Sequence, residues 1–124
     1  LKVHNFMFSV PHLTEDIYNS CRDYALEHGM AKVEPGPTHM YSYITTMFLC
    51  DSCDKAAKKA LRKCRIYKSF KMAFWGWMDF HSGLAVLEEG KAFSNASGKS
   101  AAQLLNKTLF CKAKKQLLGK EKTL

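Results

Sequence analysis

The sequence predicts an α+β fold, a ferredoxin-like split βαβ plait in the order β-α-β-β-α-β, followed by an additional C-terminal helix. Two segments, 4–10 and 69–80, alternate between apolar and polar side chains, which is typical of strands with one buried face. Apolar residues at helical spacing separate the strand-like segments, and helix N-cap residues precede them. In such a plait both helices cover the same face of the sheet.

The first strand and the first helix have clear boundaries. Residues 4–10 carry the strand pattern, and Pro11 ends it. Thr14 then predicts a helix N-cap, with acidic residues in the first turn that suit the positive end of a helix. Apolar residues at helical spacing predict a helix over 14–28, which Gly29 closes.

The next three segments predict a hairpin and a second helix. Residues 30–34 form a short strand candidate, 35–37 (Pro-Gly-Pro) indicate a turn, and 39–49 are rich in residues that favour strands. After Asp51 or Ser52, small apolar residues recur at helical spacing with lysines around them. This pattern predicts an amphipathic helix that packs closely on the sheet.

The C-terminal part contains the remaining elements. Residues 69–80 form a long strand candidate in which Gly76 places a bulge or bend. His-Ser-Gly at 81–83 indicates a turn, and 84–87 a further short strand. Ser97 or Ser100 then opens a last amphipathic helix that ends near Gly119.

The length and composition indicate one globular domain. The 124 residues are 47% hydrophobic and 24% charged, which excludes a disordered chain. We expect one domain over 1–119 and a flexible tail over 120–124. The longest uncharged segment, 35–50, is interrupted by polar residues and is shorter than the roughly 18 apolar residues that span a membrane.

The net charge of +8 is concentrated in the second half of the chain. Residues 1–54 have three basic and seven acidic residues, a net charge of −4. Residues 55–90 carry +5 and residues 91–124 carry +7. A positive field confined to one region attracts polyanions such as nucleic acid, whereas the plain alternative is a basic face that aids solubility.

Two groups of side chains are candidates for nucleic-acid binding. The first group is basic and lies on or between the two predicted basic helices: Lys55, Lys58, Lys59, Arg62, Lys63, Arg65, Lys68, Lys71, Lys112, Lys114 and Lys115. The second group is aromatic, on the strand face opposite the helices, where Lys71 would lie beside the rings: Tyr41, Tyr43, Trp75 and Trp77. Exposed rings stack with bases and nearby lysines attract phosphates. Alternatively, the C-terminal helix covers this face and the tryptophans are core residues.

The sequence predicts no metal and no cofactor. Cys50 and Cys53 have zinc-ligand spacing, and Cys64 with His39 would complete a tetrahedral set. A helix between Cys53 and Cys64 would separate them by about 16 Å, too far for one ion. In a less favoured alternative, Cys53 at a helix N-terminus would be a redox-active thiol. The plainer interpretation is that the cysteines are buried or half-buried free thiols.

The cysteines and two sequons bear on the compartment. Five cysteines cannot all pair within the chain, which favours a reducing intracellular compartment (cytoplasm, nucleus or organelle). Asn95 and Asn106 begin N-x-S/T sequons, which support a secreted, glycosylated alternative.

The function that we predict is binding of RNA or single-stranded DNA without catalysis, through the lysine-rich helices, with the aromatic strand face as a second candidate surface. Three alternatives stay open. One is an accessory subunit of a large ribonucleoprotein or protein assembly. Another is a plait-type replication nuclease with Tyr67 as nucleophile, although His39 lacks the second histidine of such metal sites. The third is the secreted, glycosylated interaction protein.

Overall fold

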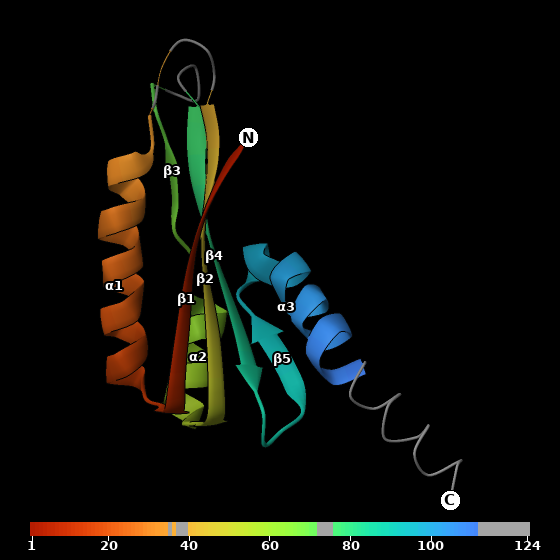
Figure 1. The fold of residues 1–124 in the computed structure, drawn as a ribbon. Coiled ribbons are helices and arrows are strands. Elements are labelled where there is room, and N and C mark those ends of the chain that lie inside the picture. Colours follow the sequence, from red (N-terminus) through yellow and green to blue (C-terminus); the bar gives the residue numbers. More distant parts are fainter. Residues whose placement is uncertain (35, 37–39, 72–75, 112–124) are drawn as a thin grey trace, which may run out of the picture.

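The computed structural model describes residues 1–34, 36, 40–71 and 76–111. The helices and strands are β1 (Lys2–Leu13), α1 (Glu15–Lys32), β2 (Met40–Cys53), α2 (Lys55–Lys63), β3 (Tyr67–Ser69), β4 (Gly76–Val86), β5 (Lys91–Ser94) and α3 (Lys99–Leu105) (Figure 1). A 3-10 turn, Ala96–Gly98, precedes α3, and a π-helical segment, Asn106–Cys111, follows it. Within these ranges, no helix is long and apolar enough to cross a membrane.

The fold is a mixed α+β structure around one five-stranded sheet. The strand order is β1-β2-β4-β3, and β5 also pairs with β4. The three long strands β1, β2 and β4 are parallel, so α1 and α2 are the crossovers that connect them. The two short strands, β3 and β5, are antiparallel to β4.

The helices lie on both faces of the sheet. Leu84 of β4 belongs to a core cluster with Tyr18 of α1 and Leu61 of α2. The preceding residue, Gly83, faces the other way, since a Cβ there would lie 3.4 Å from the Cβ of Ala101 in α3. Thus α1 and α2 cover one face, and α3 packs on the opposite face beside β4 (Figure 1).

The core lies between the sheet and the pair α1 and α2. Alternate side chains of β2 and β4 point into it. The large hydrophobic side chains of the whole core that are most deeply buried are Tyr18, Phe48, Phe80, Leu13, Ile44, Leu61, Met78, Leu84 and Val86. The helix α1 begins where the sequence predicts, because the side chain of Thr14 accepts a hydrogen bond from the Ile17 N–H at 3.2 Å. One face of α2 packs inward: Ala57 and Leu61 are fully buried, whereas Ala56, which the sequence also predicts on the inner face, is exposed.

The predicted plait order is not confirmed, because the long strands are parallel and the strand order is β1-β2-β4-β3. The reason lies in the segment after Gly29. Met30, Ala31 and Lys32 continue α1 and do not form a strand, so residues 39–49 have no hairpin partner before them. The strand β2 instead returns beside β1 in the parallel direction.

Two further predictions of local structure are wrong. Residues 81–83, predicted as a turn, lie in the middle of β4 and are buried. They do not turn because β4 continues through them to pair with β5 and with β2. The single strand predicted over 69–80 is replaced by the end of β3 and the beginning of β4. Gly76 starts β4 with φ of 100°, a conformation that favours glycine.

Candidate functional site

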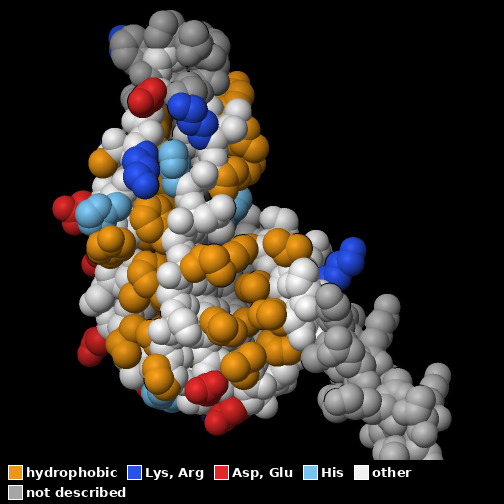
Figure 2. All heavy atoms as spheres, viewed as in Figure 1, with side chains coloured by type: hydrophobic (Ala, Val, Ile, Leu, Met, Phe, Trp, Pro, Cys, Tyr) orange, Lys and Arg blue, Asp and Glu red, His pale blue; other side chains and the backbone are white. Residues whose placement is uncertain are grey.

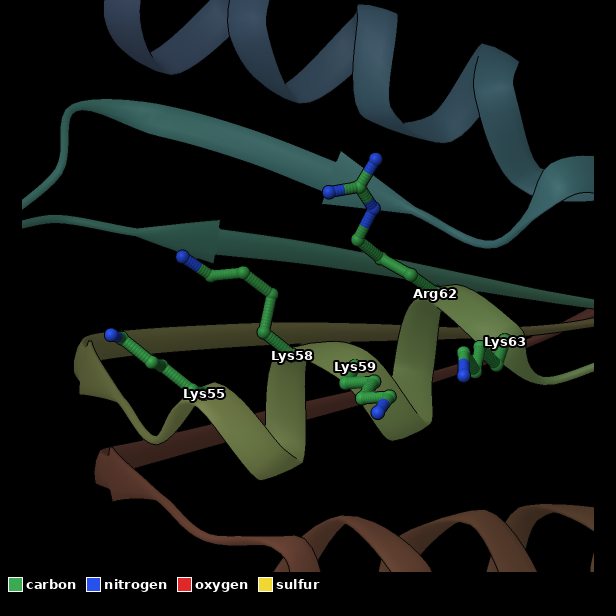
Figure 3. Close-up of a pocket in the computed structure, with 5 residues that line it drawn as sticks. All are labelled: Lys55, Lys58, Lys59, Arg62 and Lys63. Carbon is green, nitrogen blue, oxygen red and sulfur yellow. The ribbon is translucent and has the colours of Figure 1, made fainter.

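The basic residues of α2 line one hollow on the surface. Ala57 and Leu61 of this short helix turn toward the sheet, and five of its other seven positions carry a lysine or an arginine. Five side chains line a hollow of about 340 Å³: Lys55, Lys58, Lys59, Arg62 and Lys63 (Figure 3). Figure 3 also shows Arg62 extending toward β5. The structure therefore brings together five of the basic residues that the sequence singles out.

Three cations from two elements surround the ring of Phe93. The Lys58 Nζ lies 4.3 Å from the ring centroid, the Lys91 Nζ 5.5 Å and the Arg62 Cζ 6.0 Å. Each contact is within the range of a cation–π interaction. One carboxylate balances them directly: the oxygens of Glu89 lie 2.7 and 2.9 Å from the Lys58 Nζ. The positive charge at this point exceeds the negative charge.

A second hollow continues the first. Its volume is about 430 Å³, and its lining includes Arg62, which it shares with the α2 hollow, together with Lys91, Phe93 and Lys99. The two hollows therefore form one basic surface that runs from the start of α2 across β5 to the start of α3. We define this basic surface by Lys55, Lys58, Lys59, Arg62, Lys63, Lys91 and Lys99.

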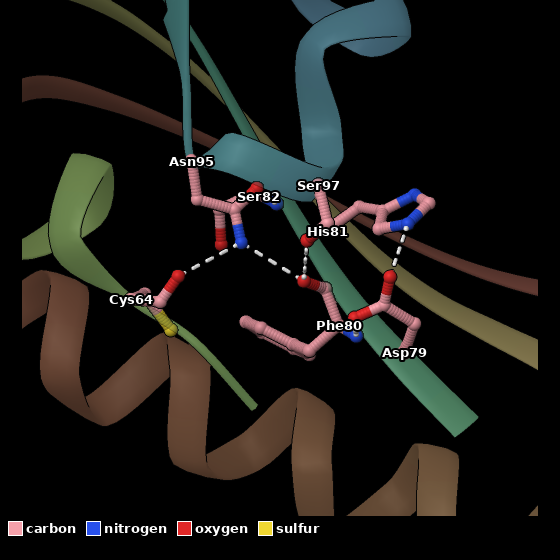
Figure 4. A network of polar contacts seen from close by, with 7 residues as sticks. All are labelled: Cys64, Asp79, Phe80, His81, Ser82, Asn95 and Ser97. Carbon is pink, nitrogen blue, oxygen red and sulfur yellow. Dashed lines mark hydrogen bonds and ion pairs between the residues drawn. The ribbon is translucent and has the colours of Figure 1, made fainter. Parts of the chain in front are cut away.

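Asn95 fixes the chain between β5 and α3, and so fixes the second hollow. This side chain is fully buried, and its Nδ2 donates hydrogen bonds to the carbonyls of Phe80, at 2.9 Å, and Cys64, at 3.1 Å (Figure 4). Because Cys64 immediately follows α2, the amide ties the end of α2 to β4. The hydroxyl of Ser97 donates to the same Phe80 carbonyl at 3.0 Å.

The aromatic candidates form a separate cluster around Trp77. The ring centroid of Trp77 lies 5.1 Å from that of Tyr41, 5.6 Å from Tyr43 and 6.2 Å from Tyr67. Tyr41 and Tyr67 are exposed, while Tyr43 and Trp77 are half-buried. We call these four rings the aromatic surface. On the same sheet face, hydrophobic side chains gather between the strands and α3 (Figure 2).

The aromatic surface and the α2 hollow lie on opposite faces of the sheet. Trp77 pairs with Tyr41 across the parallel strands, whereas its neighbour Met78 is buried in the core on the α1 side. Since successive side chains of a strand point to opposite faces, the rings point away from α2. One short segment of nucleic acid therefore cannot lie flat on both surfaces.

Arg65, Lys68 and Lys71 were also predicted, and they do not line the basic surface. Arg65 lines a different hollow with Tyr67 and Asp79. The Nζ of Lys68 lies 5.7 Å from the ring centroid of Phe70, and Lys71 is exposed just beyond β3. Four predicted residues lie outside the described part of the chain: Trp75, Lys112, Lys114 and Lys115.

Lys91, Lys99 and Phe93 are not among the residues that the sequence singles out. All three are far from α2 in the sequence. Lys91 and Phe93 reach it because β5 folds back antiparallel to β4, and Lys99, at the start of α3, lines the same hollow as Arg62. The alternation of polar and apolar residues from Lys91 to Ser94 could have predicted a short strand. It gave no indication of which element that strand would face.

Burial makes the thiols near α2 poor nucleophiles. It raises the pKa of Cys50 to about 11, and it also raises the pKa values of Cys53 and Cys21. Among the described residues, no three His, Cys, Asp or Glu side chains are grouped so that they could hold a metal ion. His39, part of the zinc set weighed from the sequence, lies outside those residues.

Both sequon asparagines serve as structural hydrogen-bonding groups. Asn95 has no exposed surface. The Oδ1 of Asn106 accepts a hydrogen bond from the Ala92 N–H at 2.9 Å. The folded structure leaves no room for a glycan at Asn95.

Comparison with known proteins gives one match. A family model described as "Domain of unknown function (DUF8052)" matches residues 2–107. No curated protein and no solved structure matches the chain. The matched range includes every residue of the basic surface and of the aromatic surface, while the predicted residues Lys112, Lys114 and Lys115 lie beyond it.

Proposed function

The chain belongs to this family of domains of unknown function, and we propose that it binds nucleic acid, RNA or single-stranded DNA, through its basic surface. The convergence of Lys58, Arg62 and Lys91 on the ring of Phe93 is the observation that carries the proposal. Like charges held this close repel one another, and a bound polyanion relieves that repulsion.

The pattern of ion pairs supports the same conclusion. Among the described residues, Glu89 is the carboxylate that pairs with a side chain of the basic surface, and it reaches Lys58. Lys55, Lys59 and Lys63 are exposed along the outside of α2. Side chains of this kind neutralise phosphates and release counterions, which gives an affinity that depends strongly on salt.

The recognition that we propose is directed at the phosphate backbone. Six of the seven side chains of the basic surface are lysines, which act as mobile point charges, and only Arg62 has a planar group suited to a base edge. Phosphate contacts position a nucleic acid without reading its sequence. We therefore expect little dependence on base sequence.

Fluorescence anisotropy of labelled oligonucleotides, titrated at several salt concentrations, tests the proposal. For each phosphate contact, the logarithm of affinity falls against the logarithm of salt with a slope of about −0.7 for single strands and about −0.9 for duplexes. We expect a slope equivalent to at least about three contacts. Absence of binding at about 50 mM salt contradicts the proposal.

A pair of double variants separates local contact from overall charge. Lys59→Glu with Lys63→Glu reverses two charges of the basic surface, and Lys2→Glu with Lys32→Glu makes the same change in net charge elsewhere. All four lysines are exposed, so folding should survive in both variants. We expect the first variant to lose at least about tenfold in affinity and the second less than about threefold. Equal losses would mean that only net charge matters.

The aromatic surface is the second candidate, because Tyr41 and Tyr67 expose their rings beside Trp77. Stacking of one base is worth about 1–3 kcal/mol. If bases bind here, Tyr67→Ala weakens single-strand binding by about tenfold and leaves the salt slope unchanged. If Tyr67→Ala binds single strands with the affinity of the original protein, base stacking at Tyr67 does not contribute, and the phosphate contacts at α2 account for the affinity.

We also propose that the protein works in a reducing compartment. The free thiols of Cys21, Cys50, Cys53 and Cys64 support this proposal. Burial of Asn95 argues against the glycosylated alternative, because a glycan acceptor has to be exposed. The mass of the protein expressed in a glycosylating host tests this proposal. We expect the mass of the unmodified chain, and a mass increased by a glycan would contradict the proposal.

A further inference from the structure

A serine, a histidine and an aspartate form a hydrogen-bonded chain at the end of the sheet nearest the start of α2. His12 and Ser52 face one another across β1 and β2, close to where both strands end. Asp54 stands between β2 and the first residue of α2. In open sheets of parallel strands, ligand sites gather outside the carboxyl ends of the strands, which is where these three residues lie.

The distances define the roles of the two imidazole nitrogens. The Nε2 of His12 lies 2.7 Å from Oδ1 of Asp54, and the Nδ1 lies 2.6 Å from Oγ of Ser52. An ionised carboxylate only accepts hydrogen bonds, so Nε2 carries a proton and donates it. In the neutral ring Nδ1 is then an acceptor, and the Ser52 hydroxyl donates to it. A histidine in this state can take the serine proton as a general base.

The use of Asp54 is a second unusual feature. Asp54 occupies the N-cap position of α2, where an aspartate side chain commonly accepts a hydrogen bond from a first-turn N–H. Here the side chain makes no such bond and reaches His12 instead. The first-turn N–H groups of α2 are therefore not covered by the cap side chain, and Ser52 lies two residues before this N-cap in the sequence.

We propose that Ser52, His12 and Asp54 hydrolyse carboxylic esters. Ser52 Oγ attacks the ester carbonyl while its proton passes to His12 Nδ1, and Asp54 stabilises the imidazolium through Nε2. The alcohol leaves with the proton from Nδ1, and the acyl group remains on Ser52. Water then attacks the acyl group, gives its proton to Nδ1, and releases the carboxylic acid, while Ser52 regains its proton. In this proposal the uncapped first-turn N–H groups of α2 stabilise the developing oxyanion.

The site is open to substrate. The side chains of His12 and Asp54 are 48% and 50% exposed, and Ser52 is half-buried. A small ester can therefore reach Ser52 Oγ without any rearrangement of the strands. The neighbouring thiol of Cys53 is the competing nucleophile, but burial of its sulfur disfavours the thiolate, as described above.

Two probes test the proposal on the full chain: hydrolysis of p-nitrophenyl acetate, and labelling by a fluorophosphonate followed by mass spectrometry. We expect the label on Ser52. Ser52→Ala should reduce hydrolysis to the background rate, and His12→Ala should lower it by about 100-fold. Ser69→Ala, which changes an exposed serine of β3, is the matched control and should hydrolyse at the original rate.

Asp54→Asn separates a catalytic chain from a merely structural one. The amide of asparagine can donate to Nε2, which moves the ring proton to Nδ1 and removes the acceptor for Ser52. We expect slow hydrolysis with an unchanged circular dichroism spectrum. Labelling of Cys53 in place of Ser52, or hydrolysis that Ser52→Ala leaves intact, overturns the proposal. Oligonucleotide binding by Ser52→Ala should be unchanged, so this site and the basic surface are tested independently.

Discussion

The side-chain oxygen of Asn95 accepts a hydrogen bond from the backbone N–H of Ser82 at 3.0 Å, in the middle of β4. The hydroxyl of Ser82 lies 2.9 Å from that of Thr46 in β2 and 3.3 Å from that of Tyr18 in α1. All four side chains are fully buried. A continuous polar chain therefore crosses the core from the turn before α3 to α1.

Replacing Asn95 with alanine should be strongly destabilising. The substitution leaves the Ser82 N–H and the Cys64 and Phe80 carbonyls without their amide partner. Buried polar groups that lose a partner cost about 1–3 kcal/mol, so we expect a loss of about 3 kcal/mol. Urea unfolding followed by circular dichroism measures it. Asn5→Ala, an exposed asparagine in β1, is the control and should change the free energy of unfolding by less than about 0.5 kcal/mol.

Glycine is required at position 98 because a side chain there would collide with its neighbours, and not because of its φ angle. Its φ of −97° is open to other residues, but a Cβ would lie 2.6 Å from the Asn95 Oδ1 and 3.1 Å from the Ser82 carbonyl oxygen. Gly98→Ala should therefore cost about 2–3 kcal/mol, measured by the urea midpoint. Gly36→Ala, where nothing lies within 4 Å of the new Cβ, should be neutral or slightly stabilising. Equal effects at the two positions would contradict this account.

Gly29 in α1 faces Ile44 of β2 at close range. A Cβ at Gly29 would lie 2.8 Å from the Cδ1 of Ile44, which is fully buried. Alanine gains about 1 kcal/mol of helix propensity over glycine, but the contact should exceed that gain. We expect Gly29→Ala to destabilise by about 1 kcal/mol.

Ile44→Ala provides the test, because it removes Cδ1 together with Cγ1 and Cγ2, which would both lie 3.0 Å from the new Cβ. In that background Gly29→Ala should become neutral or stabilising, a coupling of about 1 kcal/mol in a double-mutant cycle of urea unfolding. Strict additivity of the two changes would show that the contact between α1 and β2 has no energetic effect.

Local signals in the sequence predicted the start of α1 and the outward face of β2, but not which strands pair. Thr14 set the start of α1, and the alternation of residues 39–49 placed Tyr41 and Tyr43 on the face away from the helices, where the structure also has them. The pairing direction depends on contacts far apart in the chain. Once α1 continues to Lys32, no strand is left to form a hairpin, and β2 joins β1 in parallel.

Residues 81–83 show a second limit of local patterns. His-Ser-Gly has the composition of a turn, yet it lies inside β4. Ser82 is held by Asn95, and Gly83 gives α3 room to approach the sheet. Both partners lie later in the sequence. The same reasoning applies to the basic surface, which depends on β5 bringing Lys91 and Phe93 to α2.

Stability should fall at alkaline pH because of Cys50. Burial is the main cause that raises the pKa of this thiol from 9.0 to about 11, and nearby Cys53 and Asp51 add to it. A raised pKa means that folding favours the neutral thiol. This contribution to stability is complete below pH 9 and is lost as the pH rises through about 11.

We therefore expect the free energy of unfolding in urea to decrease by about 1–3 kcal/mol between pH 9 and pH 11. Cys50→Ala is the informative variant. It should be less stable at pH 7.5, because it leaves a small cavity in the core, but its stability should fall less steeply above pH 9. The pKa of Tyr18 is raised from 10.0, also mainly by burial, so part of the decrease above pH 10 should persist in the variant. Identical alkaline slopes for the two proteins would mean that the Cys50 thiol does not contribute to the pH dependence.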